Sequence, residues 1–254
     1  MHTESADGTR LHVETTVNGS ADTALVLVHG WLGHTRWWDA TRDAFAATHE
    51  IVAVDLAGHG ASGARAQPSA EAYASDIVSA AKCARAKRVV VVGHSMSGAY
   101  ALLAAPHIPE LVRIVLVDTL KNLDQLPPPA QAEQVLAGYR ADYAGAVRTI
   151  LPKFLFTAHT PPAVVERLTR EFLAAPGDVA AELLAPLYRF DSRVPARSIR
   201  VPVRGVGGDG GSDGVAANRA YLADYAYTTL PGCGHYPMLE QPDAFHAALR
   251  GSLS

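Results

Sequence analysis

The chain has 254 residues, of which 48% are hydrophobic and 19% are charged, and its formal net charge is −3. This composition is typical of a globular protein with one large core or a core plus a smaller lobe, and it lacks the basic excess of nucleic-acid-binding proteins. The N-terminus lacks the positive-then-apolar order of a signal peptide, and no apolar run approaches the roughly 20 residues that span a bilayer. With only two cysteines, Cys83 and Cys233, we expect a soluble, cytoplasmic protein with reduced thiols, no membrane insertion and no nucleic-acid partner.

Short runs rich in valine and isoleucine recur along the chain and predict buried strands. Their lack of polar alternation is typical of a parallel sheet that helices cover on both faces. An alternating segment, Leu11–Val17, precedes these runs and leads into Asn18-Gly19, which predicts a leading edge strand and a hairpin turn. The buried runs are Ala24–Val28, Ile51–Val54, Val89–Val92, Ile114–Val117 and the less regular Val201–Val206.

Segments with helical patterns alternate with these strands. Such alternation predicts right-handed strand–helix–strand units and therefore a doubly wound α/β sheet. The segments are Trp37–Ala47, Ser69–Ala86, Met96–Ala105 and Gln241–Leu249.

Residues 121–198 interrupt this alternation, because several helical patterns follow one another there without a strand between them. We interpret this part as a helical cap inserted into a core made of residues 1–120 and 199–254. The helical patterns are Ala132–Tyr139, Tyr143–Leu155, Ala163–Ala175 and Val179–Tyr188. Six aromatic side chains of the insertion either line a pocket or pack the cap onto the sheet; they are Tyr139, Tyr143, Phe154, Phe156, Phe172 and Tyr188.

The stretch Gly93-His94-Ser95-Met96-Ser97-Gly98 follows a predicted strand directly and opens a predicted helix. A serine on such a strand–turn–helix elbow has an exposed hydroxyl, and the small residues around it let strand and helix approach closely. Ser97 stands where the motif has its second glycine, and serine is small enough to be accommodated there. To act as a nucleophile, Ser95 needs a base, a group that orients the base, and donors for the developing oxyanion.

Three further stretches lie at the ends of other predicted strands, and together with the serine elbow they resemble the α/β-hydrolase-fold enzymes of the capped esterase and lipase-like kind. They are Leu27–Gly33, Asp55–Gly63 and Pro231–Pro242. The resemblance covers essentially the whole chain and implies a mostly parallel twisted sheet with helices on both faces and a helical cap insertion. It also implies that Ser95 is the nucleophile, that His235 is the general base, and that the backbone N–H groups of Met96 and Trp31 form the oxyanion hole.

The acid that would orient His235 is left open between several aspartates. The family's usual position lies after the strand that precedes the last one, where Asp209 is two residues early and Asp213 two residues late. Asp118 stands instead at the tip of the strand after the nucleophile helix, at the edge where ligands bind in such sheets. Some members of the fold place the acid there, and aspartate also serves as a cap or turn residue.

The resemblance implies a carboxylesterase that acts through an acyl-enzyme on Ser95, with small to medium uncharged esters as its small-molecule partners. Alternative activities on this fold are a cofactor-free ring-cleaving dioxygenase, a lactonase or carbon–carbon-bond hydrolase, and a small-ligand receptor with vestigial hydrolysis. No metal-ligand spacing such as His-x-x-x-His or Cys-x-x-Cys occurs, so we expect no metal and no cofactor. The sequence does not indicate the oligomeric state.

Overall fold

A computed structural model describes residues 1–125 and 127–254 and contains one eight-stranded sheet in the order β1-β2-β4-β3-β5-β6-β7-β8. The pairs from β4 through β3, β5, β6 and β7 to β8 are parallel, whereas β1–β2 and β2–β4 are antiparallel. The strands are β1 (His2–Glu4), β2 (Arg10–Thr16), β3 (Thr23–Val28), β4 (Glu50–Val54), β5 (Arg88–His94), β6 (Leu111–Val117), β7 (Val203–Gly207) and β8 (Tyr225–Thr229).

The predicted buried strands are confirmed with small shifts at their ends, but the predicted hairpin at Asn18-Gly19 is wrong. Strand β4 lies between β2 and β3, so the two strands that flank this turn do not pair. Asn18 instead lies in a crossing connection, where its side-chain amide donates to the carbonyl of Ala46 at 3.0 Å. Strands β1 and β8 were not predicted, because three residues at an edge and the sequence Tyr-Ala-Tyr-Thr-Thr make no continuous apolar run.

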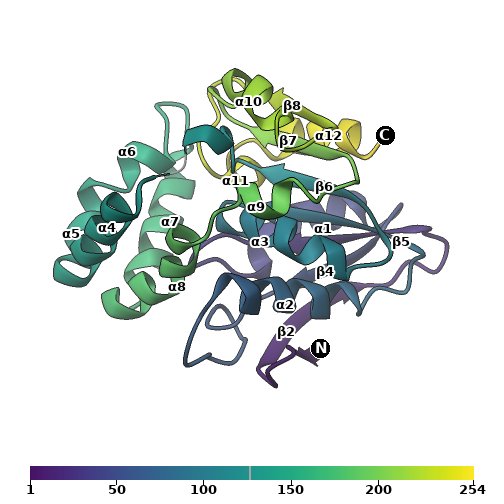
Figure 1. Cartoon of the computed structure of the whole chain (residues 1–254), viewed down its shortest axis with the longest axis horizontal. Coiled ribbons are helices and arrows are strands. Elements are labelled where there is room, and N and C mark those ends of the chain that lie inside the picture. Colours follow the sequence, from purple (N-terminus) through teal and green to yellow (C-terminus); the bar gives the residue numbers. More distant parts are fainter. Residues whose placement is uncertain (126) are drawn as a thin grey trace.

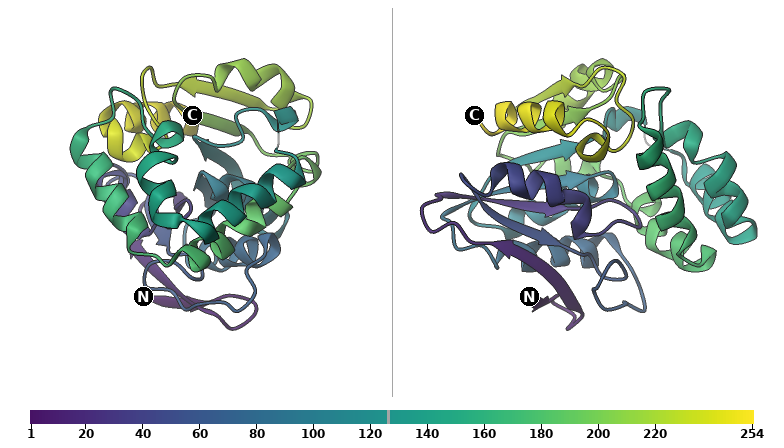
Figure 2. Two further views of the ribbon diagram at one scale, coloured as in Figure 1. Left: turned by 90° about the vertical axis from the view of Figure 1, so that its left-hand side faces the viewer. Right: turned by 180° about the vertical axis from the view of Figure 1, so that it is seen from behind.

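Helices cover both faces of the sheet, as the alternating pattern predicts (Figure 1). On one face, α2 (Ala70–Ala81) packs on α3 (Met96–Ala104), and on the other, seen from behind in Figure 2, α1 (Asp39–Phe45) packs on α12 (Pro242–Leu253). Helix α2 ends five residues before its predicted end, and its first turn is capped by Ser69, whose hydroxyl accepts a hydrogen bond from Ala72 N at 3.1 Å. The helices leave the central strands β3, β5 and β6 with almost no exposed side chain at their apolar positions.

The chain between β6 and β7 is helical and stands beyond one end of the sheet (Figures 1 and 2). The predicted helix Tyr143–Leu155 is divided in two before Pro152, because a proline has no backbone N–H with which to continue the hydrogen bonds of the preceding helix. The helices are α4 (Pro129–Ala141), α5 (Tyr143–Thr149), α6 (Pro152–Leu155), α7 (Pro162–Leu173), α8 (Gly177–Arg189) and α9 (Arg193–Ala196). No helix in the described part of the chain is long and apolar enough to cross a membrane.

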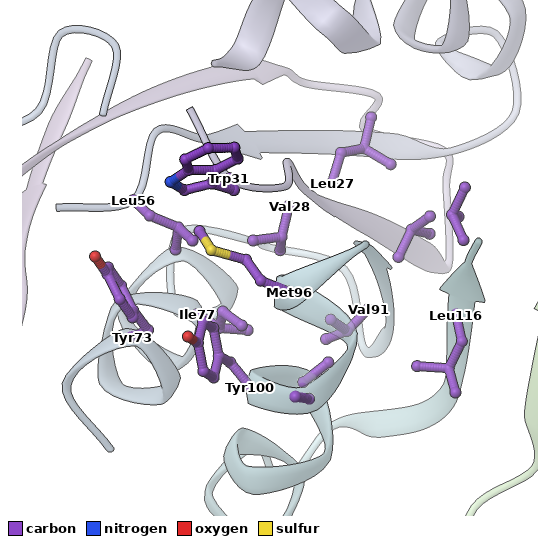
Figure 3. Packing of buried hydrophobic residues seen from close by; sticks show 14 of the residues in the cluster. Leu27, Val28, Trp31, Leu56, Tyr73, Ile77, Val91, Met96, Tyr100 and Leu116 are labelled. Atoms are coloured by element: carbon purple, nitrogen blue, oxygen red, sulfur yellow. The ribbon is translucent and has the colours of Figure 1, made fainter. Parts of the chain in front are cut away.

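The core beneath the functional loops is closely packed, as Figure 3 shows for Val28, Val91 and Leu116 from three neighbouring strands. Met96 and Tyr100 of α3 lie against the same cluster and are fully buried. Burying one such apolar side chain stabilises a fold by about 1.5–3 kcal/mol. The strand ends are therefore a rigid platform for the loops that follow them.

Candidate active site

Ser95 occupies a sharp turn between β5 and α3 with φ of 55° and ψ of −123°. This left-handed backbone costs on the order of 1–3 kcal/mol for a residue with a side chain. The Ser95 N–H donates to the carbonyl of Val117 at the end of β6, at 3.0 Å. A Cβ atom added at Gly93 would lie 2.8 Å from the carbonyl oxygen of Ser97, so the turn requires a glycine there, as the elbow motif predicts.

Ser95, His235 and Asp118 form a continuous hydrogen-bonded chain. The Oγ of Ser95 lies 2.9 Å from Nε2 of His235, and Nδ1 of His235 lies 2.7 Å from Oδ2 of Asp118. Because an ionised carboxylate can only accept hydrogen bonds, Nδ1 carries the proton and Nε2 is free to accept the serine proton. The three side chains follow β5, β8 and β6 respectively, so the sheet brings together groups that are far apart in sequence.

Asp118 is held rigidly at the tip of β6. Its φ is 45°, its side chain is 6% exposed, and its Oδ1 accepts from Gly208 N at 3.1 Å and pairs with Lys121 Nζ at 2.8 Å. Burial alone would raise the pKa of Asp118, but the hydrogen bond from His235 and the charges of His235 and Lys121 hold the pKa well below its usual value. The carboxylate therefore stays ionised beside the imidazole.

The other two candidate acids lie elsewhere. Oδ2 of Asp209 accepts a hydrogen bond from Gly232 N at 3.1 Å, and Asp213 lies in a short 3-10 helix, Ser212–Gly214. Neither carboxylate contacts His235 within residues 1–125 and 127–254, so the described structure brings only Asp118 to the imidazole.

The turn after β3 presents the predicted second oxyanion donor. Gly33 N donates to Gly30 O at 3.0 Å, and Leu32 at the third position has φ of 55°, as a type II turn requires. In the described part of the chain, the backbone N–H groups of Trp31 and Met96 donate to no other protein group. Both are therefore available to an anionic oxygen next to Ser95.

Two buried histidines support this turn from the core side. His29 accepts from Leu56 N at 3.0 Å through Nε2, so its Nδ1 donates to Gly30 O at 2.7 Å. Burial lowers the pKa of both His29 and His94 to about 3, which keeps both rings neutral. His94 Nε2 donates to the carbonyl of His235 at 2.8 Å. A Cβ at Gly30 would lie 2.7 Å from His94 Nδ1, so glycine is required at this approach.

Sequence reasoning missed Glu240, which fixes the backbone on both sides of His235. Its Oε2 accepts from Gly234 N at 2.9 Å, and its Oε1 accepts from Tyr236 N at 2.8 Å. Thr160 of the helical segment donates to the same carboxylate at 2.6 Å. An acidic residue five positions after the histidine, at the end of the short helix α11 (Pro237–Glu240), was the available signal.

A cavity of about 810 Å³ opens from Ser95 and His235 toward the helical segment. Of the six aromatic residues, Tyr139, Phe154 and Tyr188 line it. Its other walls include Val135, Leu184 and Leu187, and no lysine or arginine is among the lining residues of the described chain.

The remaining three aromatic residues, Tyr143, Phe156 and Phe172, pack instead against rings of the core. No group of three potential metal ligands occurs within the described residues. The reacting groups that the structure places at the cavity are the serine and the imidazole, with the N–H groups of Trp31 and Met96 beside them.

A family model described as the alpha/beta hydrolase family matches residues 25–248. The chain belongs to this family. Two hydrolase relatives are the pimeloyl-acyl-carrier-protein methyl ester esterases of Neisseria meningitidis and Xanthomonas campestris. The first is 32% identical over 88% of this chain and 91% of the relative, and the second is 28% identical over 94% and 97%.

Solved structures of hydrolases have the same fold over the full length of the chain. A thermophilic esterase from Thermogutta terrifontis superposes with a TM-score of 0.84 and 23% identity, covering 100% of this chain and 97% of that one. An enol-lactonase from Burkholderia xenovorans LB400 superposes with a TM-score of 0.85 and 22% identity, covering 100% and 99%. At these identities the likeness supports the α/β-hydrolase fold alone.

Proposed function

We propose that this hydrolase cleaves carboxylic esters through an acyl-enzyme on Ser95, with His235 as the general base and Asp118 as the acid of the triad. The observation that carries the proposal is the chain of two hydrogen bonds, 2.9 Å and 2.7 Å, that joins the three side chains. The relatives named as methyl ester esterases support ester hydrolysis over the dioxygenase, lactonase, carbon–carbon-bond hydrolase and receptor alternatives.

In the acylation half, Oγ of Ser95 attacks the ester carbonyl carbon while Nε2 of His235 takes the hydroxyl proton. The carbonyl oxygen becomes an oxyanion, which the N–H groups of Trp31 and Met96 stabilise. Removal of one such donor typically costs about 10²–10³-fold in kcat. The imidazolium then gives its proton to the departing alkoxide, and the alcohol leaves.

In the deacylation half, water attacks the acyl-enzyme and His235 takes a proton from the water molecule. The second tetrahedral intermediate collapses, Ser95 recovers its proton from the imidazolium, and the carboxylic acid is released. Asp118 keeps Nδ1 protonated and stabilises the imidazolium throughout without itself binding the proton.

The cavity supports uncharged acyl groups of small to medium length as substrates. Among the described residues its walls are mainly aliphatic and aromatic and include Asp142 but no lysine or arginine, so a free carboxylate on the acyl chain would find no cationic partner there. We propose that residues 121–198 act as a cap that provides most of this wall. Small alkyl esters of such acids, methyl esters included, are the substrates that we expect.

A panel of p-nitrophenyl esters with acyl chains from acetate to octanoate tests the proposal. Rapid mixing should give a burst of p-nitrophenolate with an amplitude near one per active site, because we expect acylation by these activated esters to be faster than hydrolysis of the acyl-enzyme. The Ser95→Ala variant is the control and should lose both the burst and the steady rate. Steady hydrolysis that survives in Ser95→Ala would refute the acyl-enzyme.

A further inference from the structure

The side chain of Trp31 is held by the helical segment, although its backbone belongs to the turn after β3. Its indole Nε1 donates to the carbonyl of Ala180 in α8 at 2.8 Å. The indole ring stacks on Tyr139 of α4, with ring centres 5.4 Å apart, and lies 5.8 Å from the ring of Phe172 of α7. The same residue offers the free backbone N–H, so the position of this donor depends on contacts made outside the sheet.

The loop of His235 meets the same helical segment. The ring of Tyr236, next along the chain, is buried and lies 5.1 Å from the imidazole of His235 and 6.4 Å from the ring of Phe172. The backbone N–H of His235 donates to the carbonyl of Leu155 in α6 at 2.8 Å. Both loops that carry the proposed chemistry therefore pack on the segment that carries none of it.

Phe172 is the residue that these two sets of contacts share. Its side chain is 1% exposed and it is not among the lining residues of the cavity. The preceding residue, Glu171, accepts a hydrogen bond from the indole of Trp37 at 2.8 Å, and the hydroxyl of Tyr143 donates to the carbonyl of Phe172 at 3.0 Å. The stretch of α7 that carries the ring is thus held by hydrogen bonds from the core and from α5.

We propose that Phe172 is a positioning residue for ester hydrolysis, which sets the oxyanion donor of Trp31 and the imidazole of His235 relative to one another. It acts through Trp31 and Tyr236 and touches neither the substrate nor the reacting atoms. The inference rests on the proposed function. In this arrangement the helical segment has a second task besides forming the cavity wall, because its packing assembles the site that stabilises the transition state.

The test uses p-nitrophenyl acetate, whose acetyl group is too small to fill a cavity of about 810 Å³. In Phe172→Leu, kcat for the acetate should fall about tenfold with KM little changed, since displacing an oxyanion donor costs less than the roughly 10²–10³-fold of removing it. The affinity for methylboronic acid, which forms a tetrahedral adduct with the serine, should fall by a similar factor. A residue that only shapes the acyl pocket would change the longer esters and leave the acetate and the boronate alone.

Leu168→Ala is the matched control. Leu168 is fully buried in the same helix and is absent from the cavity lining, and its truncation costs about 2–5 kcal/mol of stability. This variant should keep the kcat of the parent for the acetate. A second variant, Trp31→Phe, keeps the backbone N–H but removes the hydrogen bond to Ala180, and it should also lower kcat and boronate affinity together.

Three outcomes overturn the inference. The first is an unchanged kcat for the acetate in both Phe172→Leu and Trp31→Phe while Ser95→Ala abolishes hydrolysis. The second is an equal loss of kcat in Leu168→Ala, which would show a general effect of destabilisation. If the parent protein shows no hydrolysis that depends on Ser95, the proposed function itself fails, and this inference fails with it.

Discussion

The sheet edge and the helical segment contribute to the site in different ways. The loops after β5, β6 and β8 carry Ser95, Asp118 and His235. Hydrogen bonds hold the backbone N–H of Ser95 and the carboxylate of Asp118 in place. The segment between β6 and β7 supplies aromatic and aliphatic walls and none of the three reacting side chains. On the proposed function, the reacting side chains belong to the sheet edge and most of the wall that would contact the acyl group belongs to the inserted segment.

The two regions also differ in how their backbones are stabilised. Ser95 and Asp118 both have φ near 50°, which persists only because the parallel strands on either side hold them. The helices of the insertion have ordinary geometry and pack mainly through side chains. We therefore expect substitutions at the sheet edge to change the rate for every ester. Substitutions of cavity-lining residues in the segment should change which ester is preferred, and Phe172, which does not line the cavity, is the exception.

The largest effect is expected at the nucleophile. Ser95→Ala should lower kcat by about 10⁴–10⁶-fold for every ester, because loss of one triad member removes nearly all of the triad's contribution. Steady-state kinetics across the ester panel measures this. Ser97→Ala is the control, since the Ser97 hydroxyl donates to His29 O and not to His235, and it should retain most of the activity.

A smaller but still large effect separates the candidate acids. Asp118→Asn should lower kcat by about 10²–10⁴-fold, because the imidazole loses the partner that fixes its tautomer. Asp209→Asn, whose parent carboxylate binds Gly232 N instead, should change kcat by less than about threefold by the same reasoning. The reverse ranking in the two variants would reassign the acid.

Narrowing the cavity should affect only the longer substrates. Leu184 of α8 lines the cavity, and Leu184→Trp should lower kcat/KM for octanoate about 10–100-fold while acetate changes little, since each methylene in an apolar pocket is worth about 1–3 kcal/mol. Val179→Trp, on the exposed side of the same helix, is the matched control. An equal loss for acetate and octanoate would contradict the division between the two regions.

The smallest expected effect is on how the free energy of unfolding depends on pH. The pKa of Asp118 is lower in the folded chain than its ordinary value, so the ionised carboxylate stabilises the fold above about pH 4 and this stabilisation is lost as the pH falls further. Between pH 5 and pH 2, the parent should lose more unfolding free energy than Asp118→Asn, by on the order of 2 kcal/mol. Urea unfolding at stepped pH measures it, and parallel curves would argue against an ionised, paired carboxylate.

What the sequence could predict was local. The strand, turn and helix around Ser95 and the glycines beside it are adjacent in the chain, and the motif around His235 is similarly compact. The choice between Asp118 and Asp209 depends on which strand tip faces the imidazole, which is a matter of sheet register and loop path. The pairing of β2 with β4, which the predicted hairpin missed, has the same origin.

The contacts between the helical segment and the core could not be predicted from the sequence for a related reason. Phe172 and Trp31 are far apart in the sequence, with β4, β5 and β6 between them. Nothing in the helical pattern of α7 distinguishes its buried phenylalanine from the other apolar residues of the helix. Glu240 was within reach, because it lies in the stretch that resembles the family, but its two backbone partners depend on the path of the loop.

The most direct test of the account is the covalent labelling of the nucleophile. A fluorophosphonate should modify the parent protein once per chain, and peptide mass spectrometry should place the added mass on Ser95. The label should be absent in Ser95→Ala, present in Ser97→Ala and slowed in Asp118→Asn. Labelling of another residue, or none in a folded parent protein, would contradict the assignment of Ser95 as the nucleophile.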